Sequence, residues 1–186
     1  MGRVSQAQAQ ENRRRVVETA SRLFREQGTH VSVADLMKAA GLTHGGFYKQ
    51  FASKEALIDE ATAHAFGELA ELREAGLDQH AGKRDAAQRA LIDAYLSTEH
   101  RDDPADGCPV AALAADMARG PVDREARRVY TEGVSDFADW LTAEDQDGII
   151  RLSTMLGALL LARATQDSPL SEEILAAART ALTTSD

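Results

Sequence analysis

The chain has 186 residues, a formal net charge of −9 and 44% hydrophobic residues, which allows one or two small domains with a sizeable core. Aromatic residues make up only 5%, and the abundance of alanine and leucine favours helices over sheets. A single cysteine excludes an intrachain disulfide framework, the first 15 residues lack a signal-peptide pattern, and no apolar run can span a bilayer, so we expect a cytoplasmic protein without a membrane partner.

The first predicted helices occupy the N-terminal part of the chain. Apolar residues recur at helical spacing in ENRRRVVETASRLFREQG, where Gly28 is a natural C-terminal stop. Ser32, Thr43 and Ser53 each precede a further helical pattern, and their hydroxyl groups are expected to cap these helices. The four predicted helices cover residues 11–27, 33–40, 44–50 and 54–76.

The remaining predicted helices are separated by loops rich in Gly, Pro and Asp. The segment from Gly76 to Gly82 is a predicted loop, and HRDDPADG, GP and DSP mark three later breaks. Pro109 suits the first position of a helix, because its missing N–H is not needed there. The predicted helices cover residues 83–100, 109–119, 123–142, 146–165 and 171–183. The sequence therefore predicts an all-α fold with about nine helices.

The second and third predicted helices, joined by the turn AGLT, make a helix-turn-helix. Phe47 and Phe51 are four residues apart and share one face, which Leu36 and Leu42 can meet in a small core. Tyr48 is then rotated by about 100° and faces outward. The outer face is predicted to contain Thr43, His44, Gly45, Tyr48 and Lys49.

Gly45 and Gly46 open the third predicted helix, although a glycine costs a helix about 1 kcal/mol relative to alanine. A recognition helix enters the major groove with its N-terminal end, where missing Cβ atoms let the backbone approach DNA closely. The hydroxyls of Thr43 and Tyr48 and the ammonium of Lys49 can bind phosphate. The alternative is that the glycines form a plain loop and that Tyr48 is an ordinary half-buried aromatic residue.

The charge is divided unevenly along the chain. Residues 1–55 contain nine Lys/Arg and five Asp/Glu, a net charge of +4, whereas residues 56–186 contain 12 and 25, a net charge of −13. A basic N-terminal unit on an acidic body is expected when only that unit contacts nucleic acid.

Residues 12–58 resemble the DNA-binding domain of the tetracycline-repressor (TetR) family. The resemblance rests on ASRLFREQG and VSVADLMKAAGLTHGGFYKQFASKEAL, in this order and spacing. The chain departs from the family pattern at Met37, where alanine is common, and at Gln50, where histidine is common and where a phosphate contact loses its charge. The residues that match the pattern are Ala40, Gly41, Gly45, Tyr48, Phe51, Ser53, Lys54, Glu55 and Leu57.

The resemblance implies a division of the chain into a helix-turn-helix DNA-binding domain, residues 1–55, and a helical ligand-binding and dimerisation domain, residues 56–186. Double-stranded operator DNA and a small-molecule effector are the implied partners, with no cofactor. The residues expected to bind DNA are Thr43, His44, Gly45, Gly46, Tyr48, Lys49 and Lys54.

The last two predicted helices are the expected dimer interface. In proteins that resemble this chain, they pair with the same helices of a second copy. The stretch IIRLSTMLGALLLA, residues 149–162, is apolar on most faces, and Gly157 leaves room for a close approach. A homodimer is therefore expected, and the alternative is that these helices form the core of a monomer.

The effector pocket is expected among large side chains of the middle helices, although these residues can equally be plain core. Cys108 precedes Pro109 and has two interpretations. A helix N-terminus can activate a thiol as a sensor of oxidants or electrophiles, whereas a small buried residue is also common at a helix start. The candidate pocket residues are Tyr95, Cys108, Met117, Phe137, Trp140 and Met155.

Catalytic and metal-binding patterns are absent from the sequence. No Ser–His–Asp or Cys–His arrangement is readable, and no glycine-rich phosphate loop follows a strand. Glu60, His64 and Glu68 share a helix face, but we interpret this face as solvated and not as a metal site. The protein is therefore not expected to be an enzyme.

The predicted function is that of a ligand-responsive transcriptional regulator. We expect a repressor that binds a palindromic operator as a homodimer and is released by a small-molecule inducer. A transcriptional activator is an alternative, because the sequence does not fix the sign of regulation. An enzyme or helical adaptor with an incidental helix-turn-helix is an alternative of a different class, which the uneven charge disfavours.

Overall fold

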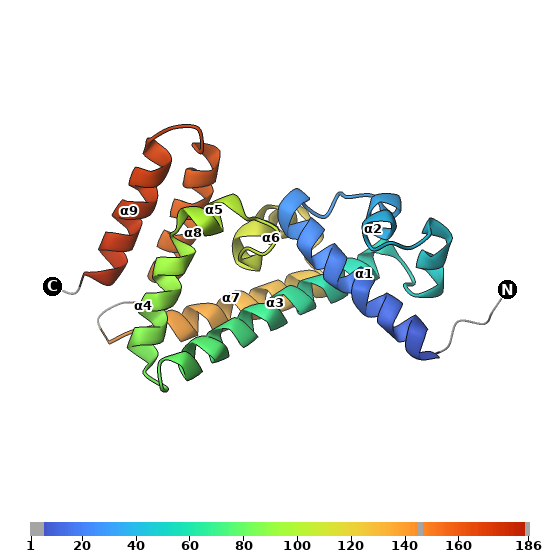
Figure 1. Cartoon of the computed structure of the whole chain (residues 1–186), viewed down its shortest axis with the longest axis horizontal. Coiled ribbons are helices and arrows are strands. Elements are labelled where there is room, and N and C mark those ends of the chain that lie inside the picture. The colour runs from blue at the N-terminus through green and yellow to red at the C-terminus, as the bar shows by residue number, and fades with distance from the viewer. Residues whose placement is uncertain (1–5, 145–146, 185–186) are drawn as a thin grey trace.

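The computed structural model describes residues 6–144 and 147–184, and within these ranges all regular secondary structure is helical (Figure 1). The predicted all-α fold is confirmed, with nine α-helices and one 3-10 helix among the described residues. They are α1 (Gln6–Gln27), α2 (Val33–Ala39), η1 (His44–Lys49), α3 (Lys54–Gln79), α4 (Arg84–Tyr95), α5 (Thr98–Asp102), α6 (Pro109–Arg119), α7 (Glu125–Leu141), α8 (Gly148–Ala164) and α9 (Leu170–Thr183).

The N-terminal helices pack around a small core, as the sequence predicts. Leu36 and Phe47 are fully buried, Phe51 is almost fully buried, and the cluster also contains Phe24 of α1. Ser32 accepts a hydrogen bond from the N–H of Asp35 at 3.1 Å, which confirms the predicted cap of α2. The core of this unit extends beyond residue 55, since Leu57, Ile58 and Ala61 of α3 belong to it.

The third helix differs from the prediction. It is a short 3-10 helix, with i→i+3 hydrogen bonds such as that from the N–H of Gly46 to the carbonyl of Thr43 at 2.9 Å. Thr43 precedes the helix but its side chain does not cap it. Two adjacent glycines disfavour a regular α-helix, and a 3-10 turn needs only a few residues.

The predicted loop from Gly76 to Gly82 is mostly wrong, because α3 continues through Gly76 to Gln79. A single glycine weakens a helix by only about 1 kcal/mol, so it need not end one. The helix stops where Ala81 and Gly82 both take a left-handed conformation, with φ angles of 52° and 74°. The connection to α4 is therefore a short turn.

The predicted helix over residues 83–100 is two helices. The first, α4, ends at Tyr95, and Ser97 caps α5 by accepting a hydrogen bond from the N–H of His100 at 3.2 Å. A serine in this position offers an alternative partner to the backbone, which favours a new helix start. The predicted loop HRDDPADG consequently begins inside α5.

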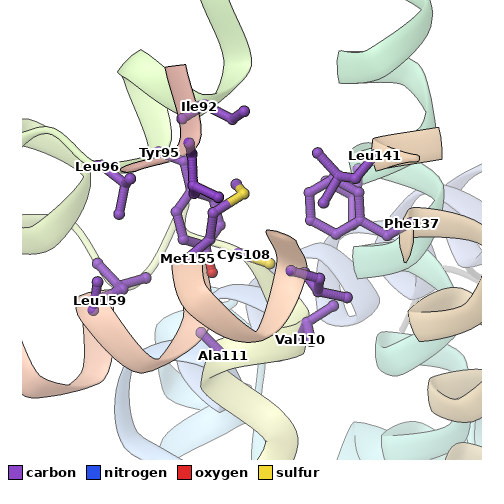
Figure 2. Packing of buried hydrophobic residues seen from close by; sticks show 14 of the residues in the cluster. Ile92, Tyr95, Leu96, Cys108, Val110, Ala111, Phe137, Leu141, Met155 and Leu159 are labelled. Atoms are coloured by element: carbon purple, nitrogen blue, oxygen red, sulfur yellow. The ribbon is translucent and has the colours of Figure 1, made fainter. Parts of the chain in front are cut away.

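The body of the molecule is built on α3 and α7, which run alongside each other over most of their length (Figure 1). The pair α8 and α9 packs against the end of this body that is remote from α2 (Figure 1). The second core cluster lies between these helices and includes Tyr95, Cys108 and Met155, which Figure 2 shows together between Leu96 and Phe137. The predicted division at residue 55 falls in the first turn of the continuous helix α3 and stays a prediction.

Candidate nucleic-acid interface and internal cavity

The outer face of η1 carries the side chains that the sequence assigns to DNA. Phe47 is fully buried, whereas its neighbour Tyr48 is 67% exposed, so the two rings face opposite environments. Thr43, His44, Gly45 and Lys49 are exposed as well. The structure therefore brings five of the predicted residues together on one surface.

Gly46 and Lys54 are half-buried. A Cβ atom added to Gly46 would meet the Cε atom of Met37 at 3.6 Å, whereas one added to Gly45 would meet nothing within 4 Å. The space around Gly45 therefore does not require glycine, and a close approach by a bound molecule is one use for the bare backbone there.

Lys54 begins α3 close to this surface. Ser53 caps α3 by accepting a hydrogen bond from the N–H of Ala56 at 3.1 Å. Gln50, where the family pattern commonly has histidine, follows η1, and its side-chain oxygen is buried without a hydrogen-bond partner among the described residues.

A cavity of about 560 Å³ lies in the body, between α3, α4, α7 and the segment from α5 to the start of α6. This volume is within the range of roughly 300–1,000 Å³ that is typical of small-molecule sites. Four of the six candidate pocket residues line it, namely Tyr95, Cys108, Phe137 and Trp140.

Met117 and Met155 do not line this cavity. Met117 of α6 packs in the N-terminal core, and Met155 of α8 is fully buried in the core of the body. Both are large apolar residues on middle or late helices, and the sequence does not show which core each would enter. Close packing of α6 against α1 places Met117 away from the cavity.

Arg25 links the N-terminal unit to the cavity. It belongs to α1, lines the cavity and is only 7% exposed. Its guanidinium donates hydrogen bonds to Glu68 of α3 at 2.8 Å and to the carbonyl of Gly107 at 3.2 Å. One turn earlier, Arg22 pairs with Asp106. Arg25 was not predicted from the sequence, because nothing in its sequence surroundings distinguishes it from a solvated arginine.

Cys108 sits in a defined polar network at the cavity wall. The Nδ1 atom of His100 lies 2.8 Å from the carbonyl of Tyr95, and its Nε2 atom accepts a hydrogen bond from the N–H of Cys108 at 3.2 Å. Nδ1 therefore carries the proton of a neutral imidazole. Burial lowers the pKa of His100 below 6.5, although the hydrogen bond to Tyr95 opposes this shift.

The thiol of Cys108 is buried, and this burial raises its pKa although nearby backbone N–H groups oppose the shift. Burial and the adjacent thiol raise the pKa of Tyr95 well above 10. A thiol with a raised pKa is a poor nucleophile at neutral pH. The structure thus favours the packing interpretation of Cys108 over the sensor interpretation.

The residues of α3 that share the face considered for a metal, Glu60, His64 and Glu68, are engaged in ion pairs or in contact with one another. Glu60 pairs with Arg13 of α1, while Glu68 pairs with Arg25 and lies 3.5 Å from His64. No group of three or more His, Cys, Asp or Glu residues within residues 6–144 and 147–184 is arranged to hold a metal ion. Over the same ranges, no helix has both the length and the apolarity needed to cross a membrane.

The chain is similar in sequence to known regulatory proteins. Residues 16–61 match the family described as bacterial regulatory proteins, tetR family. The chain is 32% identical to an uncharacterized HTH-type transcriptional regulator of Mycobacterium tuberculosis over 179 residues, which cover 83% of this chain and 86% of the relative. It is 31% identical to the HTH-type transcriptional repressor KstR2 of Rhodococcus jostii over 148 residues, covering 75% and 68% of the two chains.

The fold is shared with solved structures along nearly the whole chain. A TetR transcriptional regulator from Chloroflexus aurantiacus superposes with a TM-score of 0.75 at 26% identity, covering 95% of this chain and 94% of the other. The similarity therefore includes the cavity-bearing body as well as the N-terminal unit.

Proposed function

This chain belongs to the tetR family of bacterial regulatory proteins and is a transcriptional regulator, and from this premise we propose that it is a ligand-responsive repressor. In this proposal a homodimer binds a palindromic operator through η1 and the start of α3. A small molecule in the body weakens this binding. The relative from Rhodococcus jostii is named a repressor, which supports the sign of regulation that we propose.

DNA binding is supported by the surface of η1. Tyr48 is a large aromatic residue that is 67% exposed, and its ring contacts among the described residues are with Phe47 and His44, which do not explain its position on the surface. Its hydroxyl and the ammonium of Lys49 can bind backbone phosphates, while the bare backbone at Gly45 allows approach to the groove.

Dimerisation is supported by an apolar surface on α8 and α9. Large apolar side chains remain exposed there, and around Gly157 an added Cβ atom would meet nothing within 4 Å. Such a concentration of exposed apolar residues on two adjacent helices is typical of an interface. The exposed residues are Ile149, Ile150, Leu160, Leu161 and Leu170.

The observation that carries the ligand response is the position of Arg25. An arginine of α1 forms part of the cavity wall and holds Glu68 and Gly107 together. A molecule that fills the cavity as far as this wall therefore contacts or displaces a residue of the N-terminal unit. We infer that ligand binding changes the position of α1 relative to α3, and with it the spacing of the two DNA-binding units in a dimer.

The proposal is tested by selecting bound fragments from a random DNA library with the purified full-length protein. A repressor of the proposed kind enriches an inverted repeat, with half-sites spaced by about one helical turn or a multiple of it. Enrichment of a single asymmetric site would contradict the two-fold operator, and the absence of any enriched sequence would contradict specific DNA binding.

A further inference from the structure

One guanidinium at the cavity, that of Arg73, forms no ion pair with a carboxylate of the described residues, although Asp136 and Glu74 act on it electrostatically. Arg73 of α3 donates a hydrogen bond to the carbonyl of Asp136 at 3.0 Å and lies 5.6 Å from the centre of the Phe137 ring. No carboxylate of the described residues lies within ion-pair distance of it, in contrast to Arg25, which pairs with Glu68. Burial lowers the pKa of Arg73, yet its guanidinium remains charged at neutral pH.

A second unused donor lies at the same end of the cavity. The indole N–H of Trp140 is buried and has no hydrogen-bond partner among the described residues. Trp140 is adjacent to Phe137, with 6.4 Å between ring centres, and both rings line the cavity. An indole nitrogen can only donate, so the group that completes this end must be a hydrogen-bond acceptor.

The opposite end of the cavity is acidic. Glu68, Asp103 and Asp106 line it near the segment that precedes α6. Glu68 lies five residues before Arg73 on α3, which separates the two by about 7.5 Å along the helix axis. Because Arg22 and Arg25 are already paired with Asp106 and Glu68, the described residues at this end offer no free cation to an anionic ligand.

The wall between the two ends is apolar and in part open to solvent. Leu72 of α3 is 62% exposed and lines the cavity, and the alanines of α4 leave room opposite it. Small side chains on one wall and a leucine on the other suit a hydrocarbon better than a polar molecule. The apolar residues of these walls are Ala65, Leu69, Leu72, Ala75, Ala87, Ala90, Leu91 and Ala94.

We propose that the effector is an apolar organic acid whose carboxylate binds Arg73 and the indole N–H of Trp140. Its hydrocarbon part lies between α3 and α4 and points toward Tyr95. A carboxylate matches the guanidinium because it can accept two parallel hydrogen bonds, and it accepts a third from the indole. This inference rests on the proposed function, since it names the chemistry of the ligand that the cavity takes.

The experiment uses Trp140 as its own reporter, because it is the only tryptophan of the chain. Tryptophan emission of the full-length protein is titrated with decanoate, decanol and decylamine, which share one chain length and differ in the head group. We expect a saturable change of emission with decanoate, at concentrations roughly 10-fold or more below those needed for the alcohol. Equal or tighter binding of decanol or decylamine, or no binding of decanoate, would overturn the proposal.

Variants test the assigned residue. Arg73→Gln should weaken decanoate binding by roughly 10-fold or more and leave decanol binding unchanged, because only the acid uses the charge. Arg73→Lys, which keeps the charge but loses the fork of donors, should give an intermediate affinity. Arg89→Gln makes the same charge change at an exposed position of α4 that does not line the cavity, and it should bind decanoate like the wild type.

An unchanged decanoate affinity in Arg73→Gln would contradict the proposed site. If that variant folds poorly, the comparison of decanoate, decanol and decylamine on the wild type still tests the ligand class. The titration contains no DNA, so its outcome is independent of operator binding. If decanoate binds as expected but does not release the protein from the operator, the binding site for the acid is supported and the proposed ligand-responsive repression is contradicted.

Discussion

Arg25 of α1 and Glu68 of α3 form an ion pair of 2.8 Å at the cavity wall, with the arginine side chain 4% exposed and the glutamate side chain 43% exposed. The buried partner is thus the cation, which belongs to the N-terminal unit. The exposed partner is the carboxylate, which belongs to the body. The consequences of removing either residue are therefore unequal.

Glu68→Ala should destabilise the protein by about 1–3 kcal/mol, because a buried guanidinium then keeps only its carbonyl partners. Urea unfolding measures this change. Glu71→Ala, at an exposed position of the same helix, should change the free energy of unfolding by less than about 0.5 kcal/mol. Equal stabilities of the two variants would show that the ion pair does not hold α1 to α3.

Cys108→Ser should bind operator DNA with unchanged affinity, since the thiol lies in the body and away from η1. The thiol of the native wild type should react with iodoacetamide much more slowly than that of the urea-unfolded protein, because burial raises its pKa. Release of the wild type, but not of the variant, from the operator by peroxide or an electrophile would restore the sensor interpretation.

His100 should make the protein less stable in mild acid. Its pKa in the folded protein lies below 6.5, so the unfolded chain binds more protons as the pH falls below about 6.5. The stability that neutral His100 contributes is therefore complete above about pH 6.5 and is lost as the pH falls through the folded pKa. Asp103 and Arg163 also act on this group, with opposite effects on its pKa.

The measurement for His100 is urea unfolding between about pH 7.5 and about pH 5, on the wild type and on His100→Gln. The variant should lose less stability over this range, because its side chain does not titrate. An identical pH dependence of the two proteins would contradict the assignment.

Leu161→Arg should convert the protein from a dimer into a monomer. The wild type is expected to sediment at about twice the 20.1 kDa mass of the chain, through the apolar surface on α8 and α9. Leu161 is 59% exposed on this surface, so a charge there would remain unpaired at the interface. Val122→Arg alters an 80% exposed residue between α6 and α7 and should remain dimeric. A wild type that sediments as a monomer would contradict the proposed interface on α8 and α9.

Much of the N-terminal unit could be predicted from the sequence because its signals are local. Ser32 and Ser53 cap their helices, Gly28 takes a φ of +87° after α1, and the four-residue spacing of Phe47 and Phe51 places Tyr48 outside. Such signals act between residues close in the chain. The 3-10 geometry of η1 was missed, since the same residues also fit a short α-helix.

The cavity was less predictable because its walls come from distant segments. Four of the predicted pocket residues, Tyr95, Cys108, Phe137 and Trp140, line the cavity, whereas Met117 and Met155 fill two different cores. That these four residues bind a ligand stays a prediction. The roles of Arg25 and Arg73 depend on what faces them across the fold, and no sequence pattern specifies a partner that lies tens of residues away.

We predict that the outer face of η1 binds DNA and does not serve folding. The direct measurement is operator affinity against salt concentration for the wild type and for Lys49→Ala, Tyr48→Ala and Phe47→Ala, with thermal melting in parallel. Lys49→Ala should reduce the slope of log affinity against log salt concentration by about two, because one phosphate contact is lost in each protomer of a dimer. Tyr48→Ala should bind the operator with lower affinity. Both should keep the melting temperature of the wild type, whereas Phe47→Ala should lose about 3–5 kcal/mol of stability. Wild-type operator affinity of Tyr48→Ala and Lys49→Ala, or early melting of either variant, would contradict the account.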